Sequence, residues 1–585
     1  MYRPACLRLP ETWLRAKSFK SGYSRTPHSR QVHQDGYISM FSNSAPSSRF
    51  EHVTNEPVLQ YLKGSSEREN LFRAIREIRE ASPIEIPMVI NGKSVRSDDV
   101  GDVRLPHEHK TVIARYHKAG PEHIEEAIAS SIDARKSWAK LPSDDRLSIF
   151  LKAAELLSDK YWRSKIVAAT VLGQSKTIYQ AELDAACELI DFWRFGAYYS
   201  SCLYEPQPNS LTGVWNRLVY RPLEGFVYAI SPFNFTAIGG NLVSTPVMLG
   251  NVAFWKPSSY SLLSNYYTML LLKEAGLPDG VINFVPGDPA KITDKVIVNR
   301  QLAGIHYTGS TDIFRRLYTD VGKNISNYIS YPRIVGETGG KGFVFAHRSA
   351  DISALVVAII RGAFEYAGQK CSAASRAYIP ASIWPMVKAE LLEKMKSVKL
   401  GSPESPDVFV NAVIHNASFE KSKSYIDYAR ASSEAEIIYG GNCDNSVGYF
   451  VDPTIIVTSD PYFKSMVEEI FGPIMTIYVY SDDQFIETLK ICDSSTPYSL
   501  TGCFWANDRE AIRTADYYLE NTAGNFYIND KPTAAVVAQQ PFGGSRASGT
   551  NDKAGSHLNL IRWVSARVIK ETFMPTHDVL YPYMK

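Results

Sequence analysis

The chain has 585 residues, of which 45% are hydrophobic, 21% charged and 12% aromatic, with a formal net charge of +2. This length exceeds what one hydrophobic core usually supports, so we expect two or more lobes, and the composition excludes disorder over most of the chain. The near-zero charge gives no indication of a nucleic-acid partner, and no apolar run reaches the roughly 20 residues of a membrane-spanning helix. The longest apolar run, ALVVAII at 354–360, predicts a buried helix.

The first 50 residues are basic and rich in serine. They hold eight Lys or Arg residues and nine serines, but only two acidic residues, Glu11 and Asp35. This composition predicts a mitochondrial transit peptide, which we place at 1–45, and therefore a location in the mitochondrial matrix. A disordered cytosolic tail is the alternative.

Short elements follow in a regular order. Residues 84–95 predict a β-hairpin, because Asn91 and Gly92 form a dipeptide typical of two-residue turns. Residues 120–200 predict helices that open near Pro121, since apolar residues recur there at three- and four-residue spacing. Beyond residue 220, predicted strands alternate with predicted helices. The strands lie at 226–230, 251–255, 281–285 and 304–308, and the helices at 237–249, 262–275 and from 312 onward.

Strands separated by helices of this length predict βαβ units and a parallel sheet, which binds ligands at the carboxyl ends of its strands. A second alternating block covers roughly 340–553, with predicted strands at 412–414, 436–440, 475–480 and 525–528. We therefore expect an α/β protein of two lobes with a cleft between them. The seven cysteines include no CxxC pair, which argues against a zinc ribbon or a redox dithiol, and we expect no metal site.

The most suggestive thiol lies in FEYAGQKCSAASR, residues 364–376. Asp351 could cap a helix running to about residue 366, and Gly368 could end it, which would leave Cys371 on the following loop. Lys370, if held close, would favour the thiolate. The alternative is a buried, small apolar side chain, and Cys187 and Cys202 receive that interpretation because they lie in apolar or aromatic stretches.

Other candidate residues follow predicted strands. Glu337 in GETGGKG could be a general base, or it could be a solvated residue of a glycine-rich turn. Asn234 in SPFNFTA could donate to an oxyanion, or it could form an Asx-turn. Gly309 and Ser310 lie between a strand and a helix, where a pyrophosphate would meet a helix N-terminus. EEIFGP at 468–473 and the glycine-rich 541–555 segment complete the set.

These motifs stand in a specific order: SPFNF, FWKPS, YTGS, GETGGK, GQKCS, EEIFGP, GNFYIND and PFGG. In this order they resemble the aldehyde dehydrogenase superfamily over about 85–570. Five further segments are most similar to its Δ1-pyrroline-5-carboxylate (glutamate-semialdehyde) dehydrogenase branch. They are QAELDAACELIDFWRF, EGFVYAISPFNFTAIGGNL, FEYAGQKCSAASR, VGYFVDPTI and SRASGTNDKAG.

The resemblance implies NAD-dependent oxidation of L-glutamate γ-semialdehyde to L-glutamate in proline catabolism. Cys371 would be the nucleophile that forms a thiohemiacetal and then a thioacyl-enzyme, the Asn234 amide an oxyanion donor, and Glu337 the base that activates water. A sister aldehyde dehydrogenase with another substrate is one alternative. A non-catalytic paralogue that kept the fold is a second, although all three chemical groups are present.

The resemblance also implies a cofactor site and a substrate site. Lys256 and Glu469 resemble contacts to the two riboses of NAD, and Phe471 resembles the aromatic residue beside the nicotinamide. Ser259 stands where many relatives carry an acid near the adenine ribose, so NADP is an alternative cofactor. The cofactor-binding residues are Ser231, Trp255, Lys256, Gly309, Ser310, Glu469 and Phe471. The substrate-binding residues are Glu188, Phe235, Lys370, Ser372, Ala534, Ala535 and Phe542.

One of these expectations has an alternative interpretation, and another concerns a loop whose sequence differs from that of relatives. Asp184, Glu188 and Asp191 lie on one helical face and could all be solvated instead. The loop at 531–540 reads KPTAAVVAQQ, where relatives commonly have K-S-T-G-S/A-V-V-G-Q-Q. Ala534 therefore replaces a glycine whose backbone approaches the substrate carboxylate, and its extra methyl group could weaken binding or shift the substrate.

The resemblance implies a fold with a Rossmann-like cofactor domain, an α/β catalytic domain and a β-flap for oligomerisation. The NAD-binding domain is expected at 46–203 and 221–338, and the catalytic domain at 339–553. The flap is expected at 204–220 and 556–577, so we expect a homodimer or a larger homo-oligomer.

Overall fold

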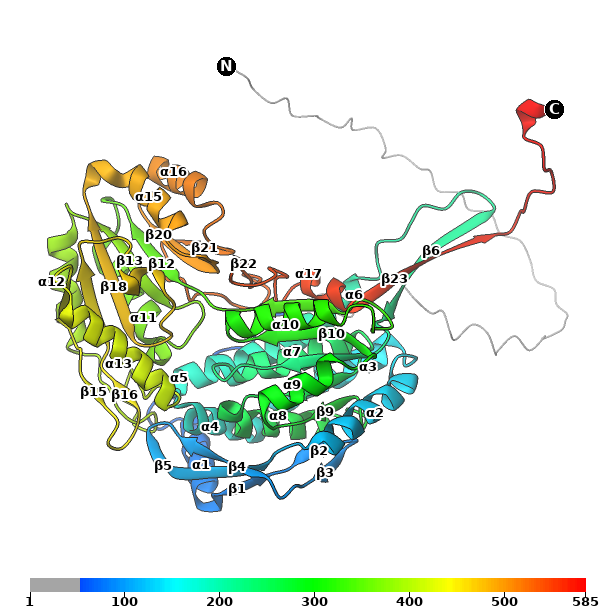
Figure 1. Ribbon diagram of the computed structural model, residues 1–585, viewed down its shortest axis with the longest axis horizontal. Helices are drawn as coiled ribbons and strands as arrows, with labels where there is room; N and C mark the ends of the chain where they lie inside the picture. Colours follow the sequence, from blue (N-terminus) through cyan, green and yellow to red (C-terminus); the bar gives the residue numbers. More distant parts are fainter. Residues whose placement is uncertain (1–52) are drawn as a thin grey trace, which may run out of the picture. The chain divides into compact units, whose positions relative to one another are not determined.

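Two seven-stranded sheets organise the part of the chain that the computed structural model describes, residues 53–585 (Figure 1). The transit peptide predicted at 1–45 lies outside the described residues. The first sheet has the strand order β11-β10-β7-β8-β9-β2-β3. Its strands are β11 (Arg333–Glu337), β10 (Leu302–Thr308), β7 (Phe226–Ile230), β8 (Ala253–Lys256), β9 (Ile282–Phe284), β2 (Met88–Ile90) and β3 (Lys93–Val95).

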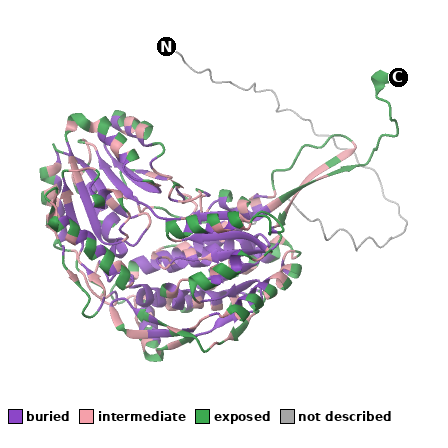
Figure 2. Ribbon diagram, in the orientation of Figure 1, coloured by how far each residue is buried: buried purple, intermediate pink, exposed green. Residues whose placement is uncertain are grey.

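The five strands from β11 to β9 are parallel, as the βαβ pattern predicted. They are buried almost throughout, because helices cover them (Figure 2). The strands alternate with α7 (Thr236–Met248), α8 (Leu262–Glu274), α9 (Pro289–Ile297) and α10 (Thr311–Lys323). The carboxyl ends of the central strands therefore meet at one edge of the sheet, where the candidate residues follow them.

The predicted hairpin forms over a shorter range than 84–95. β2 and β3 pair antiparallel around Asn91 and Gly92, whose φ angles of 49° and 71° are the left-handed values that this turn needs. Residues 84–86 form a separate strand, β1 (Ile84–Ile86), in a three-stranded sheet with β5 (Glu108–His117) and β4 (Val100–Leu105). The sequence pattern merged the two strands, because both are apolar and only Pro87 separates them.

Helices cover 120–200 as predicted. They are α2 (Pro121–Trp138), α3 (Ser143–Ser158), α4 (Lys160–Gln174), α5 (Ile178–Ala181) and α6 (Leu189–Cys202). Between α5 and α6 the chain forms a π-helix, η1 (Glu182–Glu188). Helix α1 (Ser66–Ala81) precedes them and packs against α4.

The solvated alternative for the acidic face of residues 184–191 is wrong for Asp184 and Asp191, which are both buried. Asp184 accepts the backbone N–H groups of Thr236 and Ala237 at 2.9 and 2.8 Å, so it caps the start of α7. It also accepts a hydrogen bond from Lys176 Nζ at 2.7 Å. Burial is tolerated because each carboxylate oxygen has a partner.

The second sheet has the strand order β14-β17-β18-β13-β12-β20-β21. Its strands are β14 (Ala435–Tyr439), β17 (Thr454–Thr458), β18 (Ile474–Tyr480), β13 (Ala374–Pro380), β12 (Gly342–Ala346), β20 (Thr501–Trp505) and β21 (Asn525–Ile528). All pairs are parallel except β14 with β17. Its helices include α11 (Ile352–Phe364), α12 (Trp384–Met395), α13 (Asn416–Ala431), α15 (Phe485–Ser494) and α16 (Arg509–Leu519). Each sheet has its own hydrophobic core.

The strand predicted at 412–414 is wrong. The segment is buried but lies in a loop, because its backbone binds scattered partners and not a neighbouring strand. Val413 N–H donates to the Tyr449 carbonyl at 2.9 Å, and Ile414 N–H donates to Gln369 Oε1 at 2.8 Å. The run is therefore apolar because it is buried beside Gln369, and not because it belongs to a sheet.

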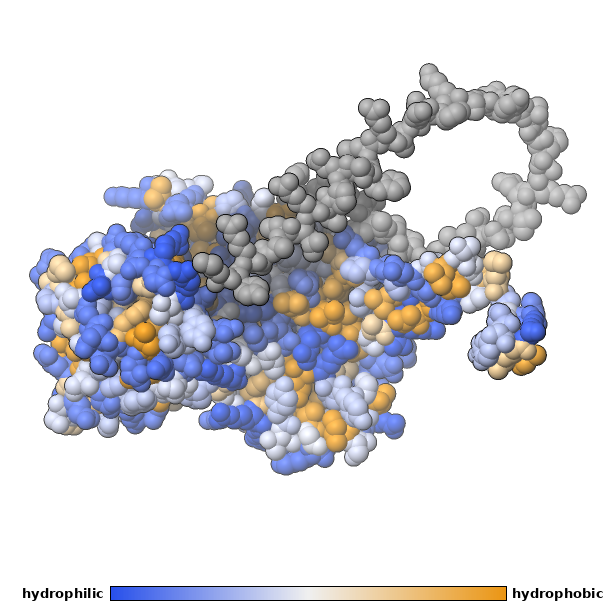
Figure 3. Space-filling view, turned by 90° about the horizontal axis from the view of Figure 1, so that it is seen from above, coloured by the Kyte–Doolittle hydropathy of each residue, from blue (hydrophilic) through white to orange (hydrophobic). Residues whose placement is uncertain are grey.

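A long two-stranded ribbon projects from the body (Figure 1). It pairs β6 (Val214–Pro222) antiparallel with β23 (Val564–Thr572), so the two segments expected to form the flap do lie together, although the strand begins only at Val214. Trp215 and Val568 are 47% and 67% exposed on it. The projecting part shows both hydrophobic and hydrophilic surface (Figure 3). Within residues 53–585, no helix is both long and apolar enough to cross a membrane.

A buried ion pair between α4 and η1 provides a stability test. Arg163 donates to Glu182, and both side chains are almost completely buried. Glu182→Gln should lower the free energy of unfolding by about 3 kcal/mol, because it leaves part of the buried guanidinium charge uncompensated. The measurement is the urea midpoint. Glu85→Gln is the matched control: it breaks the exposed Glu85–Arg96 pair and should cost less than about 1 kcal/mol. Equal midpoints for the two variants would contradict the prediction.

Candidate active site

The predicted nucleophile stands on a loop that begins with an unusual turn. After α11 ends at Phe364, Tyr366, Ala367 and Gly368 have φ angles of 53°, 52° and 68°. Three successive left-handed residues are costly when two of them carry side chains, so the surrounding structure must hold this turn. At Gly368 a Cβ atom would lie 2.3 Å from the Gly472 carbonyl oxygen, so only glycine fits there. The turn places Cys371 between α11 and β13, as expected.

The surroundings of Cys371 disfavour its ionised form. Burial, together with the carboxylates of Glu337 and Glu469, raises the pKa of the Cys371 thiol to about 12, while the backbone N–H groups of Ser372 and Cys371 itself oppose the shift. The resting group is therefore a neutral thiol. The two N–H groups are the donors that would stabilise the sulfur when its proton leaves.

The expectation that Lys370 favours the thiolate is wrong. Lys370 Nζ donates to Glu365 Oε2 at 3.0 Å, and Lys531 Nζ lies 3.6 Å from the same oxygen. Glu365 therefore binds the Lys370 ammonium, and Lys370 is not among the largest influences on the Cys371 thiol. The Glu365 carboxylate connects the nucleophile loop, residues 365–373 between α11 and β13, to the 531–540 loop.

Glu337 is the last residue of β11, at the strand end where the motif placed it. Its backbone carbonyl accepts the Gly309 N–H at 3.2 Å, and its Oε2 atom is buried with no partner among residues 53–585. Burial raises the pKa of Glu337 well above its ordinary value, against the opposing effects of the Lys553 ammonium and the Gly544 N–H. A raised pKa makes the ionised carboxylate a stronger base than an exposed glutamate, which is what a general base needs.

Asn234 lies in the loop between β7 and α7 and reaches the nucleophile loop. Its Nδ2 atom donates to the Gln369 carbonyl at 3.1 Å, two residues before Cys371. A side-chain amide carries two N–H bonds, so a second donor remains for an oxygen atom bound at the site. Asn234 is buried, which strengthens any such interaction.

Glu469 and two glycines complete the surroundings of the thiol. Glu469 Oε1 accepts the Gly340 N–H at 2.8 Å. At Gly340 a Cβ atom would lie 2.1 Å from the Cys371 carbonyl oxygen, so the backbones pass each other closely. Two residues after Glu469, Phe471 has a φ angle of 63°, and its ring contacts Phe233 edge to face at 5.8 Å. Residues 337–342, which join the two sheets, thus lie beside Cys371.

The predicted dinucleotide residues lie at the carboxyl ends of β7, β8 and β10. Lys256 is 7% exposed, burial lowers its pKa to about 8, and no described residue forms an ion pair with it. A buried cation without a partner is costly, so this group is suited to a polar ligand. Ser310 precedes α10 without capping it through its side chain, which leaves the first N–H groups of the helix to an anion.

Trp255 acts differently from the role expected of it. Its side chain is completely buried, and its indole N–H donates to Ser231 Oγ at 3.1 Å. The indole therefore positions Ser231 and is not itself exposed to a ligand. Gly309 is constrained by the neighbouring strand, since a Cβ atom there would lie 2.4 Å from the Tyr307 hydroxyl.

Three of the predicted substrate residues surround one buried lysine, Lys176, which the sequence analysis did not identify. Lys176 Nζ lies 4.0 Å from the centre of the Phe235 ring and 4.5 Å from that of Tyr366. The pKa of Glu188 is raised to about 8 by burial and by Asp184, against the positive charges of Lys176 and Lys370. Glu188, Phe235 and Lys370 thus belong to one charged group. No local motif marks Lys176, because its partners come from three distant segments.

The remaining predicted substrate residues lie on adjoining loops. The Ser372 carbonyl accepts a hydrogen bond from Thr501 Oγ1 at 3.2 Å, and Phe542 N–H donates to the Ala554 carbonyl at 3.0 Å. Ala534 packs against the second core, whereas Ala535 is exposed. Ala534 is not among the described residues with positive φ, so alanine fits its backbone without strain. Ala538, in contrast, has a positive φ of 68°.

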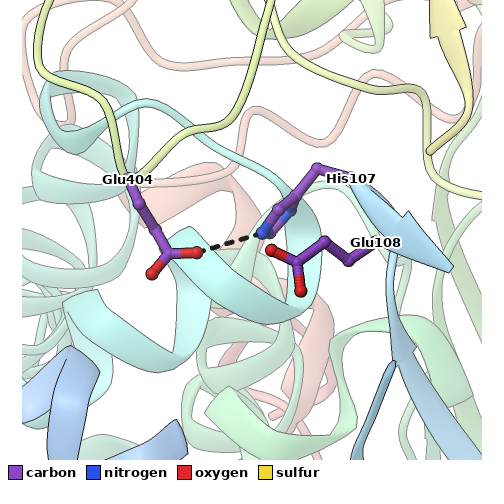
Figure 4. A group of neighbouring side chains, drawn as sticks. All are labelled: His107, Glu108 and Glu404. Atoms are coloured by element: carbon purple, nitrogen blue, oxygen red, sulfur yellow. Dashed lines mark ion pairs between the residues drawn. The ribbon is translucent and has the colours of Figure 1, made fainter. Parts of the chain in front are cut away.

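One group elsewhere combines possible metal ligands: His107, Glu108 and Glu404 (Figure 4). His107 Nε2 lies 3.4 Å from Glu404 Oε1. Arg79 donates to both carboxylates, to Glu108 at 2.9 Å and to Glu404 at 2.9 Å through Nε. Because a cation already neutralises the carboxylates, we assign the group to an ion-pair network between the two lobes.

Comparisons with known proteins agree with this geometry. The model of the aldehyde dehydrogenase family matches residues 95–567. The mitochondrial Δ1-pyrroline-5-carboxylate dehydrogenase of Dictyostelium discoideum is 53% identical over 533 residues, 91% of this chain and 95% of that protein. The Homo sapiens protein of the same name is 47% identical over 534 residues, 91% of this chain and 94% of that protein. The crystal structure of Δ-pyrroline-5-carboxylate dehydrogenase from Mycobacterium tuberculosis bound with NAD has a TM-score of 0.88 at 48% identity, and covers 91% of this chain and 98% of that chain.

The electrostatic influence of Glu469 on the thiol can be tested without any substrate. Glu469→Gln removes a negative charge that raises the pKa of Cys371, so the thiolate fraction should increase. Alkylation of Cys371 by iodoacetamide at pH 8 should be faster by roughly 3- to 10-fold, measured by mass spectrometry. Glu468→Gln is the matched control, because that carboxylate accepts a hydrogen bond from Tyr425 and does not influence Cys371. An unchanged rate for Glu469→Gln would show that the assignment is wrong.

Proposed function

Since this chain belongs to the aldehyde dehydrogenase family, we propose that it oxidises L-glutamate γ-semialdehyde to L-glutamate in proline catabolism, with NAD as the hydride acceptor. The open semialdehyde is in equilibrium with Δ1-pyrroline-5-carboxylate. One observation carries the proposal: the Glu337 carboxylate acts on the Cys371 thiol, and the buried Asn234 amide binds the Gln369 carbonyl two residues before it, in a chain about half identical to enzymes named for this substrate.

In the first step, the Cys371 thiol releases its proton to solvent and its sulfur attacks the aldehyde carbon, so that the carbonyl oxygen becomes an oxyanion in a thiohemiacetal. The second N–H of the Asn234 amide and the Cys371 backbone N–H would donate to that oxygen. Losing one such donor typically raises the barrier by roughly 3–4 kcal/mol. When bound, NAD accepts the hydride that leaves the thiohemiacetal carbon.

In the second step, Glu337 accepts a proton from water, and the resulting hydroxide attacks the thioester that joins the acyl group to Cys371. The carbon–sulfur bond breaks, glutamate leaves and the thiol is regenerated. The raised pKa of Glu337 suits this task, because its carboxylate, once ionised, accepts a proton more readily than an exposed glutamate does. The buried, unpartnered Oε2 atom is the available acceptor.

The residues present fit the dinucleotide. Lys256, buried and without an ion pair within 53–585, would contact the adenine-side ribose, and Glu469 would contact the nicotinamide-side ribose. The N-terminus of α10 after Gly309 and Ser310 would face the pyrophosphate. Ser231, positioned by Trp255, would line the path. Phe471 would lie beside the nicotinamide.

Substrate recognition is assigned to the charged group and the neighbouring loops. Glu188, a carboxyl group near Lys176 and Lys370, would accept the ammonium of the semialdehyde. Lys370, Ser372 and the backbone at Ala534 and Ala535 would contact its α-carboxylate. Phe235 and Phe542 would cover its aliphatic chain.

Domain roles, assembly and location follow from the same resemblance. We assign dinucleotide binding to 46–203 and 221–338, and catalysis to 339–553. The β6–β23 ribbon, with its exposed apolar side chains, would join copies into a homodimer or a larger homo-oligomer. The basic 1–45 segment would direct the chain to the mitochondrial matrix, in keeping with relatives that are named mitochondrial.

The direct test is a substrate panel with both NAD and NADP. The wild type should reduce NAD on addition of glutamate semialdehyde, and Cys371→Ser should lower turnover by more than about 1,000-fold while the circular dichroism spectrum stays unchanged. Cys443→Ser is the control, since that half-buried thiol lies on a distant strand. Turnover of another aldehyde without turnover of the semialdehyde would indicate a sister dehydrogenase. Failure to bind any nicotinamide dinucleotide would indicate a non-catalytic paralogue.

Glu337→Gln should separate the two steps. The amide cannot accept the proton of water, so thioester hydrolysis should slow by about 100-fold or more. One equivalent of NADH per active site should then appear in a rapid first turnover, followed by a slow phase in stopped-flow absorbance.

In the wild type, the hydrolysis rate should increase with pH, because the raised pKa of Glu337 keeps the carboxyl group protonated at lower pH. The variant should lose that increase. A variant without a burst, or one with the wild-type pH profile, would exclude Glu337 as the base.

A further inference from the structure

We infer that Asn55 is a positioning residue for the substrate loop, which we define as residues 531–540. The inference rests on the proposed function, because that function assigns Ala534 and Ala535 in this loop to the substrate carboxylate. Asn55 itself belongs to an extended segment at the start of the described chain, residues 53–62, which we call the arm.

The arm is fixed to the helices that carry Glu188. The Glu56 carboxylate accepts hydrogen bonds from Arg163 and Arg194, each at 2.6 Å. Tyr61 Oη donates to Glu182 Oε2 at 2.7 Å, and Leu59 N–H donates to Glu182 Oε1 at 3.1 Å. These carboxylates are buried and each is bonded to a guanidinium, so strong charge-assisted hydrogen bonds attach the arm to the helices.

Asn55 connects this arm to the end of the substrate loop. Its Nδ2 atom donates to Asp191 Oδ2 at 2.8 Å and to the Val537 carbonyl at 2.9 Å, while its Oδ1 atom accepts from Gln539 Nε2 at 2.9 Å. Both donors and the acceptor of the amide are therefore used. Aspartate would lack the donors and would place a second carboxylate beside Asp191.

The residue between these two contacts is strained. Ala538 has a φ of 68°, a left-handed value that alanine avoids and glycine adopts freely, and relatives commonly carry glycine there. Asn55 binds the residue before it and the residue after it. The clamp therefore holds Ala538 in a conformation that alanine would otherwise leave.

The opposite end of the substrate loop is attached to the nucleophile loop. Lys531 Nζ lies 3.6 Å from Glu365 Oε2, which also accepts from Lys370, the residue before Cys371. Ala534 and Ala535 thus stand between one attachment to the nucleophile loop and a second to the arm. Releasing the second attachment would let their backbone move relative to Cys371, and misplacement of a binding group weakens binding without altering the thiol itself.

The steady-state experiment uses the full processed enzyme. Asn55→Ala should raise the KM for glutamate semialdehyde by about 10-fold, while kcat and the KM for NAD change less than about 2-fold. Gln60→Ala is the matched control, because Gln60 is an exposed arm residue whose side chain donates a hydrogen bond within the arm, to the Val58 carbonyl. It should leave all three constants unchanged.

A double variant separates positioning from general stability. Adding Ala538→Gly to Asn55→Ala should restore the KM to within about 3-fold of the wild type, because glycine adopts the left-handed conformation without the clamp. A loss of overall stability would not be rescued in this way. Gln539→Ala removes one clamp contact from an exposed side chain and should raise the KM by about 3-fold, and it serves if Asn55→Ala does not fold.

Hydrogen–deuterium exchange provides a readout that needs no turnover. The amides of 536–540 should exchange faster in Asn55→Ala than in the wild type, with no change in α7. A wild type inactive on the semialdehyde would refute the proposed function alone, since the exchange result still tests the clamp. An active wild type with unchanged KM and unchanged exchange in both Asn55→Ala and Gln539→Ala would overturn the inference.

Discussion

The Asp184 carboxylate holds together the segments on which the site depends. It caps α7 through the N–H groups of Thr236 and Ala237, immediately after Asn234 and Phe235, and it neutralises Lys176. Lys176 in turn contacts the rings of Phe235 and Tyr366, and Tyr366 begins the left-handed turn that leads to Cys371. One buried acid therefore sets the oxyanion donor of the first lobe against the nucleophile loop of the second. Asp184 belongs to the π-helix η1, which directs its side chain into the protein interior.

Burial, more than any charge pair, determines the chemistry of the site. It raises the pKa values of Cys371, Glu337 and Glu469, and it lowers that of Lys256. A buried site strengthens hydrogen bonds to an oxyanion, and the two carboxyl groups disfavour a resting thiolate. In the proposed mechanism the thiol ionises only as its proton leaves, and the backbone N–H groups near the sulfur would supply the stabilisation. Lys370 does not contribute, because Glu365 takes its charge.

Contacts between loops hold the site residues in place relative to one another, although these residues come from two lobes. Residues 337–342 join the sheets beside Cys371, Glu365 joins the nucleophile loop to the substrate loop, and Asn55 joins that loop to the arm. The last two connections link segments far apart in the chain, and the Asn55 contacts join the arm of the first lobe to a loop that follows the second sheet. Alanine at 538, where relatives commonly have glycine, makes the last of these connections more important in this chain.

The sequence by itself determined the elements and the chemical groups. The alternation of apolar runs predicted the parallel strands of the first sheet, and the ordered motifs singled out Cys371, Glu337 and Asn234, because strand ends and glycine-rich turns are local signals. It could not separate β1 from the hairpin or reject a strand at 412–414, since burial and strand formation produce the same apolar run. Only the tertiary structure decided which charged and polar groups pair. It showed that Lys370 binds Glu365, that Asp184 is a buried cap, and that Lys176 and Asn55 contact the residues of the site. Those outcomes depend on tertiary contacts: Asn55 and Asp184 bind residues tens to hundreds of positions away, and Glu365, only five residues before Lys370, reaches it across a left-handed turn that no local pattern encodes.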